Sequence, residues 1–299
     1  MIAVALAAAA ALAAPAQTDV QRQLAFSWTR NGNTDIYLVG ANGKGLRRLT
    51  RSRARDMSPS WSADGTKLAF RTNRDGNDQV YVMNADGSAQ RNLTRTTSTD
   101  YSPAWAPDGK AIAFASNRGG DSRTLDDIWL VDADGSNPRR LELRVGIDEY
   151  PVWSPDGNTI AFACTNDVIL PQRVGDFEIC LMNADGSDVR RVTDAPGLSI
   201  AWSWSPDGTR IAFDSNRRDS PYGVDEGGDL FLMDADGTHV RPLTRGPAHD
   251  AQPVFSPSGR HIAFTSNRRR RPGLYLMDAN GSHVRLILRG SISDPAWRP

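Results

Sequence analysis

The chain has 299 residues whose 35 Lys and Arg balance 35 Asp and Glu, and this zero net charge argues against a globally basic protein that binds nucleic acid. Its content of 39% hydrophobic and 23% charged residues is ordinary for a globular protein and excludes a disordered chain. Two cysteines are too few for a disulfide-rich scaffold or for a four-thiolate zinc site.

The first segment, residues 2–14, is an unbroken apolar run made mostly of alanine. At roughly 13 residues it is too short to span a bilayer, which takes about 20. A small-x-small pattern follows at Ala14-Pro15-Ala16, so we interpret residues 1–16 as a secretory signal peptide. No Lys or Arg precedes the run, which leaves open a start upstream of Met1 or an alanine-rich tail. With no transmembrane segment elsewhere, we expect a periplasmic or secreted protein.

One pattern recurs along the rest of the chain. It opens on an aromatic residue and a turn such as Ser-Pro-Asp-Gly and ends on Ile-Ala-Phe, as in residues 61–70 and 105–114. Further copies start at Trp153, Trp204 and Phe255, so that successive copies are 44 to 51 residues apart. A period of about 40–50 residues, with several short strands in each unit, is typical of a β-propeller.

Each unit predicts four strands. A short first strand ends at the Pro-Asp-Gly turn, where Pro presets the turn and Gly accepts a positive φ. The second strand is the apolar Ile-Ala-Phe, and the third, such as residues 80–83, ends in the hairpin turn Asn-Ala-Asp-Gly at 84–87. The fourth strand is rich in arginine, as at residues 47–50, and this composition suits a solvated outer edge.

Five complete units and one unit assembled from both termini make six. Trp297 begins a copy that the chain end truncates, and residues 24–26 supply the missing second strand. We therefore predict an all-β, six-bladed β-propeller of four-stranded antiparallel blades over residues 17–299. The last strand, around residues 295–297, is expected to pair with residues 24–27 and to close the ring.

The combination of Asp-x-x-Pro-x-Trp-Ser-Pro-Asp-Gly, Ile-Ala-Phe-x-Ser-Asn-Arg, Ile-Tyr-Leu-Met-Asn-Ala-Asp-Gly and Arg-Arg-Leu-Thr resembles the TolB-type, WD40-like propeller repeat over about residues 22–299. The resemblance implies this fold and an exported protein of the cell envelope. TolB-type proteins carry an N-terminal α/β domain before the propeller and work in the Tol-Pal system, whereas this chain resembles the propeller without that domain. Similar repeats occur in propellers attached to peptidases and in some sugar lyases.

Four aspartates occupy one repeated position, five residues before the aromatic residue: Asp56, Asp100, Asp148 and Asp250. As a ring near the mouth of the central channel, these carboxylates would suit a hard cation such as Ca²⁺. Alternatively, each Asp pairs with turn N–H groups or with a repeated Arg and fixes the connection between blades. Ser199 and Ile292 stand at the two remaining positions, which leaves the ring incomplete.

The connections between second and third strands are lengthened in three consecutive units, to 14 or 17 residues against 10 elsewhere. Loops at one end of a rigid scaffold are where binding residues concentrate, so we predict that this face binds a partner. Tolerated surface insertion is the alternative. Unrepeated residues expected on this face are Asp148, Glu149, Tyr150, Ile169, Leu170, Tyr222, Asp225, Glu226 and His249.

A run of four arginines, residues 268–271, is expected on the same face. Within it, Arg269 and Arg270 would attract an acidic partner such as an anionic envelope polymer or an acidic protein surface. The alternative is a solvated charge run with no partner.

Linear catalytic motifs are absent: the chain has no Gly-x-Ser-x-Gly, no His-Glu-x-x-His and no P-loop. Only His249, beside Asp250, suits a ligand or a base. We therefore predict a monomeric, non-catalytic binding scaffold of the envelope whose partner is a protein or an anionic polymer and not nucleic acid. The alternative is a propeller enzyme, of the polysaccharide lyase or hydrolase type, with a metal-assisted site at the channel mouth.

The two cysteines fall in one unit. Cys164 ends a second strand where other units have Ser or Thr, and Cys180 lies in the next strand where others have an aromatic residue. Adjacent antiparallel strands would bring the two together, and an exported protein meets an oxidising compartment. We predict a disulfide that closes the long connection between them, with two buried free thiols as the alternative.

Overall fold

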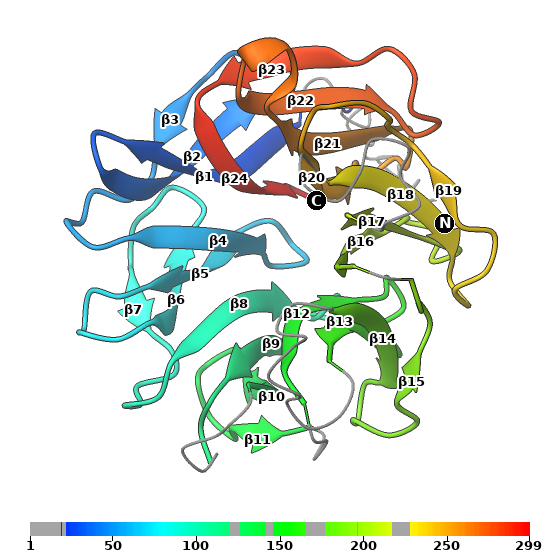
Figure 1. Cartoon of the computed structure of the whole chain (residues 1–299). Coiled ribbons are helices and arrows are strands. Elements are labelled where there is room, and N and C mark those ends of the chain that lie inside the picture. Colours follow the sequence, from blue (N-terminus) through cyan, green and yellow to red (C-terminus); the bar gives the residue numbers. More distant parts are fainter. Residues whose placement is uncertain are drawn as a thin grey trace, which may run out of the picture.

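The computed structural model of the chain describes Asp19 and residues 22–119, 126–141, 146–165, 177–195, 197–216 and 228–299. Over these residues the chain forms six four-stranded antiparallel sheets, arranged as blades around a central channel (Figure 1). The predicted signal peptide, residues 1–16, lies outside the described part. Among the residues described, no helix has the length and the apolar character needed to cross a membrane.

The blades are numbered in chain order, and blade 1 combines the C-terminal strand with the first three strands. The innermost strands of blades 1 to 6 are β24 (Ser291–Trp297), β4 (Asp56–Trp61), β8 (Asp100–Trp105), β12 (Asp148–Trp153), β16 (Ser199–Trp204) and β20 (Asp250–Phe255). The second strands are β1 (Gln23–Arg30), β5 (Lys67–Thr72), β9 (Ala111–Ser116), β13 (Thr159–Cys164), β17 (Arg210–Ser215) and β21 (His261–Ser266).

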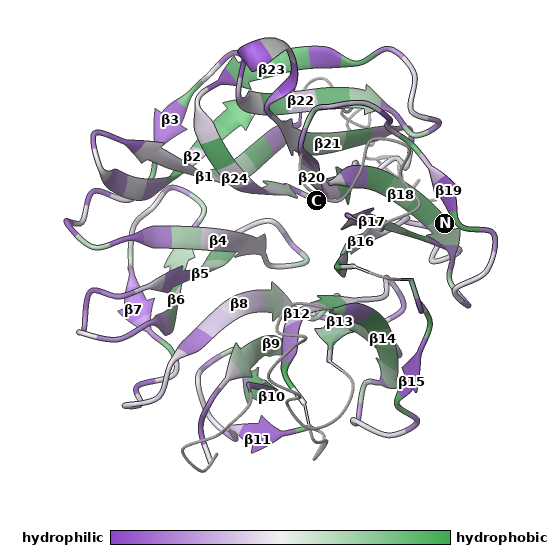
Figure 2. Ribbon diagram, viewed as in Figure 1, coloured by the Kyte–Doolittle hydropathy of each residue, from purple (hydrophilic) through white to green (hydrophobic). Residues whose placement is uncertain are grey.

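The third strands are β2 (Asn33–Gly40), β6 (Gln79–Asn84), β10 (Asp127–Asp132), β14 (Glu178–Asn183), β18 (Asp229–Asp234) and β22 (Gly273–Asp278). The outermost strands are β3 (Arg47–Arg48), β7 (Arg91–Asn92), β11 (Arg139–Arg140), β15 (Arg190–Arg191), β19 (Arg241–Pro242) and β23 (Arg285–Arg289). A short 3₁₀ helix, η2 (Arg268–Arg270), follows β21. Figure 2 shows the short outermost strands as hydrophilic and the strands between them and the channel as largely hydrophobic.

The hydrophobic core consists of layers between neighbouring blades. The phenylalanine of each Ile-Ala-Phe motif is fully buried: Phe26, Phe70, Phe114, Phe162, Phe213 and Phe264. Each buried cluster combines residues of two adjacent blades, as where Leu38 of blade 1 packs with Phe70 and Tyr81 of blade 2. Because every blade is covered on both faces, its middle strands are apolar on both sides.

The predicted closure of the ring is confirmed. β24 pairs antiparallel with β1, so that Trp297 lies opposite Leu24 and Ala296 opposite Ala25. The indole N–H of Trp297 donates to the carbonyl of Val254 in blade 6 at 3.2 Å. The closing strand therefore fastens blade 1 to blade 6 as well as completing its own sheet.

The hairpin turns between third and outermost strands touch the preceding blade. Gly87 has a φ of +91°, and a Cβ built there would lie 2.7 Å from the carbonyl oxygen of Leu49. The same approach to the preceding blade recurs at Gly135, Gly186, Gly237 and Gly281. Glycine at this turn therefore meets two needs, a left-handed backbone and close contact between blades.

We expect Gly87→Ala to lower the free energy of unfolding by about 2–3 kcal/mol, because steric overlap adds to backbone strain. Gly109→Ala is the matched control, since Gly109 also has a positive φ of +73° but nothing lies within 4 Å of its Cβ position. That control should lose only about 1 kcal/mol. Urea unfolding measures both variants, and equal losses would show that the contact with Leu49 does not matter.

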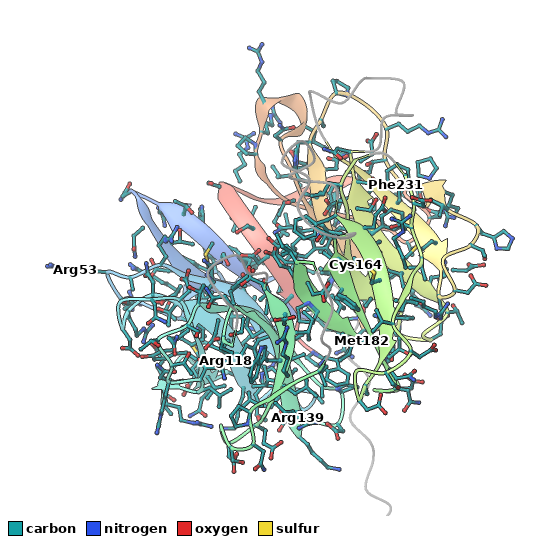
Figure 3. All side chains as sticks on the ribbon, turned by 60° about the horizontal axis from the view of Figure 1, so that its bottom comes forward. Arg53, Arg118, Arg139, Cys164, Met182 and Phe231 are labelled. Atoms are coloured by element: carbon teal, nitrogen blue, oxygen red, sulfur yellow. A yellow bond between two sulfur atoms is a disulfide. The ribbon has the colours of Figure 1, made fainter. Side chains whose placement is uncertain are left out.

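Cys164 and Cys180 form a disulfide between β13 and β14 (Figure 3), with their Cα atoms 5.9 Å apart. The register places Cys180 opposite Phe162, so the bridge joins diagonal positions of the two strands. Both cysteines are fully buried.

We expect titration of the denatured, unreduced protein to find no free thiol. Replacing both Cys164 and Cys180 by Ser should lower the free energy of unfolding by about 3 kcal/mol, because a closed loop of about 15 residues restricts the unfolded chain by that amount in the chain-entropy model. The doubly substituted protein also supplies the blank for the titration. Two titratable thiols in the wild type would contradict the disulfide.

Candidate functional site

Each innermost strand carries a bulge where it faces the channel. In β4, Met57 pairs with Arg71 and Ser60 with Ala69, so two residues of β4 lie opposite one residue of β5. The second bulged residue is a proline in five blades, and the residue before it has a φ of 50–58°: Ser58, Ser102, Tyr150, Gln252 and Asp294. Proline disfavours the right-handed helical region for the residue before it and donates no ladder hydrogen bond, so the sheet pairing breaks here.

Blade 5 departs from this pattern. Its bulge in β16 is the single residue Trp202, which stands where the other blades have proline. The six bulges therefore carry side chains of five different types: Ser58, Ser102, Tyr150, Trp202, Gln252 and Asp294. We call these six residues the bulge ring.

A cavity of about 530 Å³ lies in the channel. Its lining includes five members of the bulge ring and, towards the turns between first and second strands, prolines and the aromatic residues that end the innermost strands. The rings of Tyr150 and Trp202 lie side by side in it, with centroids 5.4 Å apart. This cavity lies at the end of the channel opposite to the long connections, which was not the face that we expected to bind a partner.

The tryptophans that end the innermost strands are part of the scaffold. The indole N–H of Trp61 donates to the carbonyl of Ala296, that of Trp153 to Ala104 and that of Trp204 to Val152, each at 3.2 Å. In each case the acceptor belongs to the preceding blade. These side chains therefore shape the cavity wall while they join the blades.

Asp294 is a centre of hydrogen bonding in the bulge ring. Its carboxylate accepts from Ser27 Oγ at 2.7 Å, from the Ser58 N–H at 3.2 Å and from Gln252 Nε2 at 2.8 Å. Gln252 in turn accepts from the Asp294 N–H at 2.9 Å. Blades 1, 2 and 6 meet at this carboxylate, and no salt bridge to it is found within the described part of the chain.

Asp214 lies next to this network in β17, and its side chain is only 7% exposed. Its Oδ1 accepts the N–H of Gln252 at 3.0 Å. Burial raises the pKa of Asp214 to about 7, against the opposing effects of the hydrogen bonds from Gln252 and Trp202. The position after the phenylalanine in a second strand is occupied by Ser27, Arg71, Ala115, Ala163 and Thr265 in the other blades, so the carboxylate is peculiar to blade 5. Ser27 accepts the corresponding N–H of Ser58 from the next blade.

A second charged group is centred on Arg71 of β5. Arg71 pairs with Asp78, and its guanidinium lies 5.2 Å from the centroid of the Tyr101 ring. The Tyr101 hydroxyl donates to Glu149 Oε1 at 2.7 Å. Burial raises the pKa of Glu149, and it raises that of Asp126 as well.

Three of the four repeated aspartates form ion pairs within their own blades. Asp56 pairs with Arg74 at 2.9 Å, Asp100 with Arg118 at 2.6 Å and Asp250 with Arg268 at 2.6 Å. Each arginine ends the second-strand motif and also lies over the ring of the motif phenylalanine: Phe70, Phe114 and Phe264. Within the described ranges, no three His, Cys, Asp or Glu side chains come together as metal ligands. The structure thus favours the pairing alternative over a shared Ca²⁺ site at Asp56, Asp100, Asp148 and Asp250.

The other predicted site residues do not lie together in the structure. Tyr150 lines the cavity and Glu149 accepts from Tyr101, whereas Asp148 is buried at the start of β12. His249 is exposed and its backbone pairs with Asn267, while Arg270 is exposed in η2. Five residues fall outside the described part, as does the side chain of Arg269: Ile169, Leu170, Tyr222, Asp225 and Glu226.

Sequence reasoning missed Trp202 and Asp294, which line the cavity, and three residues that interact with the lining: Arg71, Asp214 and Gln252. The signal was present, because each stands at a repeated position with a side chain that differs from its counterparts. Reading the copies against each other at positions next to the conserved core pattern would have found them.

Comparison with known proteins agrees with this architecture. The family model described as the Tricorn protease N-terminal beta propeller domain matches residues 17–125. A TolB homolog of Chlorobium luteolum is 31% identical over a match that covers 36% of this chain and 33% of that protein. The match thus spans about a third of the length of this relative.

Solved structures show the same fold. TolB from Acinetobacter baumannii superimposes with a TM-score of 0.76 at 20% identity, covering 94% of this chain and 68% of that chain. A structure described as a TolB of Agrobacterium tumefaciens has a TM-score of 0.69 at 20% identity and covers 89% of this chain and 88% of its own.

Proposed function

Since the chain is a TolB-like β-propeller, we propose that it is an exported, non-catalytic binding module of the cell envelope that works as a monomer. The channel cavity, with Tyr150, Trp202 and Asp294 in its lining, is its ligand site. An anionic envelope polymer or an acidic envelope protein is the expected partner of the opposite end, where Arg270 is exposed.

The observation that carries this proposal is the diversity of the bulge ring. In a repeat protein the recurring residues serve the scaffold, yet these six positions carry five different residue types although five of them share one backbone conformation. The same conformation accepts Ser at 58 and 102 and Tyr at 150, so packing does not require the aromatic ring. Ligand sites are concave and largely apolar with a few convergent polar groups, as this cavity is.

Export is supported by separate features. Structural disulfides persist in oxidising compartments and are rare in the cytosol, so the Cys164–Cys180 bridge favours the periplasm or the exterior. The apolar run at residues 2–14 followed by Ala14-Pro15-Ala16 has the composition of a signal peptide.

The test uses the full chain purified from the periplasm of an expressing bacterium, with mass spectrometry of the molecules released on denaturation. A ligand should be released by the wild type and be missing from a Ser58→Tyr, Ser102→Tyr variant. That variant fills the cavity with the side chain that the same backbone carries at Tyr150. Equal release by both proteins would contradict the channel as the ligand site.

A second variant controls for the opposite face. Replacing residues 167–176 and 218–227 by short Gly/Ser loops should leave the released ligand unchanged. Loss of the ligand from this variant alone would assign binding to the long connections instead. The enzyme alternative has its own readout, because product formation from a polysaccharide in the presence of a divalent metal ion would overturn the non-catalytic role.

A further inference from the structure

We propose that the bulge ring binds a small organic cation, a primary amine on a short aliphatic chain. The ammonium group lies against the faces of Tyr150 and Trp202 and near the Asp294 carboxylate, and the aliphatic chain lies along the prolines and tryptophans of the cavity. This inference rests on the proposed function, since it names the ligand class for the same channel site.

The aromatic pair provides the first part of the argument. Tyr150 and Trp202 come from adjacent blades, and their rings are tilted by 49° with centroids 5.4 Å apart. Both line the cavity, and neither residue recurs at the equivalent positions of the other blades. The faces of tyrosine and tryptophan attract ammonium groups, most strongly where water is excluded.

The charge around this pair provides the second part. Asp294 lines the cavity, and Gln252 connects it to the buried Asp214: the Gln252 N–H donates to Asp214, and its side-chain amide donates to the Asp294 carboxylate and accepts from the Asp294 N–H. The pKa of Tyr150 is raised to about 12 by burial and then by the negative charges of Glu149, Asp294 and Asp214, with Arg71 opposing them. Three carboxyl groups are therefore near enough to Tyr150 to act on its hydroxyl.

The nearby cation acts on Glu149 only through its charge and forms its ion pair elsewhere. Arg71 is already paired with Asp78 and lies over Tyr101. The hydrogen bonds to Asp294 come from neutral hydroxyl, amide and backbone groups. Buried charge without a counter-ion is costly, so a cationic ligand gains free energy by supplying one.

The size and polarity of the cavity select an organic ion. No three acidic or His side chains in the described ranges converge closely enough to hold a metal ion. The cavity of about 530 Å³ is instead in the range of small-molecule sites and is lined mainly by apolar groups. An alkylammonium ion satisfies both features, because its charged end needs one carboxylate and its chain needs apolar walls.

Binding should also release protons. The charged and titratable groups that act on Tyr150 are Glu149 from β12, Asp214 from β17, Asp294 from β24 and Arg71 from β5. Glu149 and Asp126, from the segment before β10, act on Tyr101 of β8. Burial raises the pKa of Asp214 to about 7, so this group is partly protonated in the free protein near neutrality. A bound cation favours the ionised carboxylate, so affinity should rise several-fold between pH 6 and pH 8.

The experiment is calorimetric titration of the full chain with pentane-1,5-diamine, with pentane-1,5-diol and glutarate as neutral and anionic probes of the same length. The diamine should bind with a sub-millimolar Kd, and the two other probes should bind at least tenfold more weakly. Equal binding of the diol or of glutarate, or no binding of the diamine, would overturn the proposal. Ca²⁺ displacing the diamine at equal concentration would assign the site to a metal ion instead.

Variants locate the site. Asp294→Asn and Tyr150→Ser should each weaken diamine binding at least tenfold, and Ser is the residue that two other blades carry at the position of Tyr150. Asp134→Asn, which removes an exposed turn carboxylate, should leave binding unchanged. Unchanged affinity in Tyr150→Ser would overturn the proposal even if Asp294→Asn fails to fold.

Failure of this inference differs from failure of the proposed function. A ligand that is released from the wild type and lost from Ser58→Tyr, Ser102→Tyr while the diamine does not bind would keep the channel site and exclude the organic cation. A lysine-containing peptide that binds where the free diamine does not would likewise exclude a small amine.

Discussion

Deleting residues 294–299 should abolish cooperative unfolding of the propeller or lower its free energy of unfolding by more than 5 kcal/mol. The deletion removes Trp297, which is 8% exposed, together with its bond to Val254 and the pairing of β24 with Leu24 and Ala25. Burying one large side chain contributes about 3–5 kcal/mol, and a domain of ordinary stability has only about 5–15 kcal/mol in total. The measurement is urea unfolding followed by far-ultraviolet circular dichroism.

Two smaller changes at the C-terminus should lower the stability less than the deletion does. Removing only the exposed Pro299 should leave the unfolding midpoint nearly unchanged. Trp297→Phe should lose about 1 kcal/mol, because it keeps the ring but removes the donor to Val254. Blade 6 naturally has Phe255 at this position, so the fold accepts a phenylalanine side chain there. If the deletion protein melted within a degree or two of the full chain, closure by β24 would be unimportant.

Asp100→Asn should lower the free energy of unfolding by about 3–5 kcal/mol, the usual result of removing one partner from a buried ion pair. Asp100 is fully buried, and its carboxylate accepts from Arg118 and Ser116, both at 2.6 Å. The substitution leaves the largely buried guanidinium of Arg118 without its counter-ion. Urea unfolding of the variant and the wild type measures the difference.

The control is Asp108→Asn, which removes one partner of an exposed pair. Asp108 lies 3.7 Å from Lys110, and both side chains are solvent-exposed, so the loss should be under about 1 kcal/mol. Both variants are measured with EDTA and with added Ca²⁺. If Ca²⁺ raised the urea midpoint of the wild type but not that of Asp100→Asn, the repeated aspartates would bind Ca²⁺ and the ion-pair assignment would be wrong.

Repetition made much of the fold predictable. A pattern that returns every 44 to 51 residues reports the same local structure each time, so strand order, turn positions and the number of blades follow from one unit. The half-units at Trp297 and residues 24–26 are complementary and predict the closure. The cysteine pair was equally local, because both residues lie in adjacent strands of one blade.

The candidate site was less accessible to sequence reasoning. Attention to the longest loops directed the prediction to one end of the channel, while the described cavity lies at the other. Glu149 and Tyr150 were chosen as unrepeated residues of the face with the long connections. Tyr150 lines the cavity, and Glu149 accepts a hydrogen bond from Tyr101. Asp214 was overlooked because an aspartate in an apolar second strand shows no motif of its own.

By itself, the sequence determined the elements, the blade count and the closure, since these depend on contacts between residues near in the chain or on a repeated pattern. Only the tertiary structure decided which differing residues meet. Tyr150 and Trp202 are separated by about fifty residues, and Asp294 reaches Ser58 only across the closed ring. The physical reason is that a propeller brings six strands that are far apart in the sequence to one axis. No pattern in the neighbouring sequence marks the side chains that meet there.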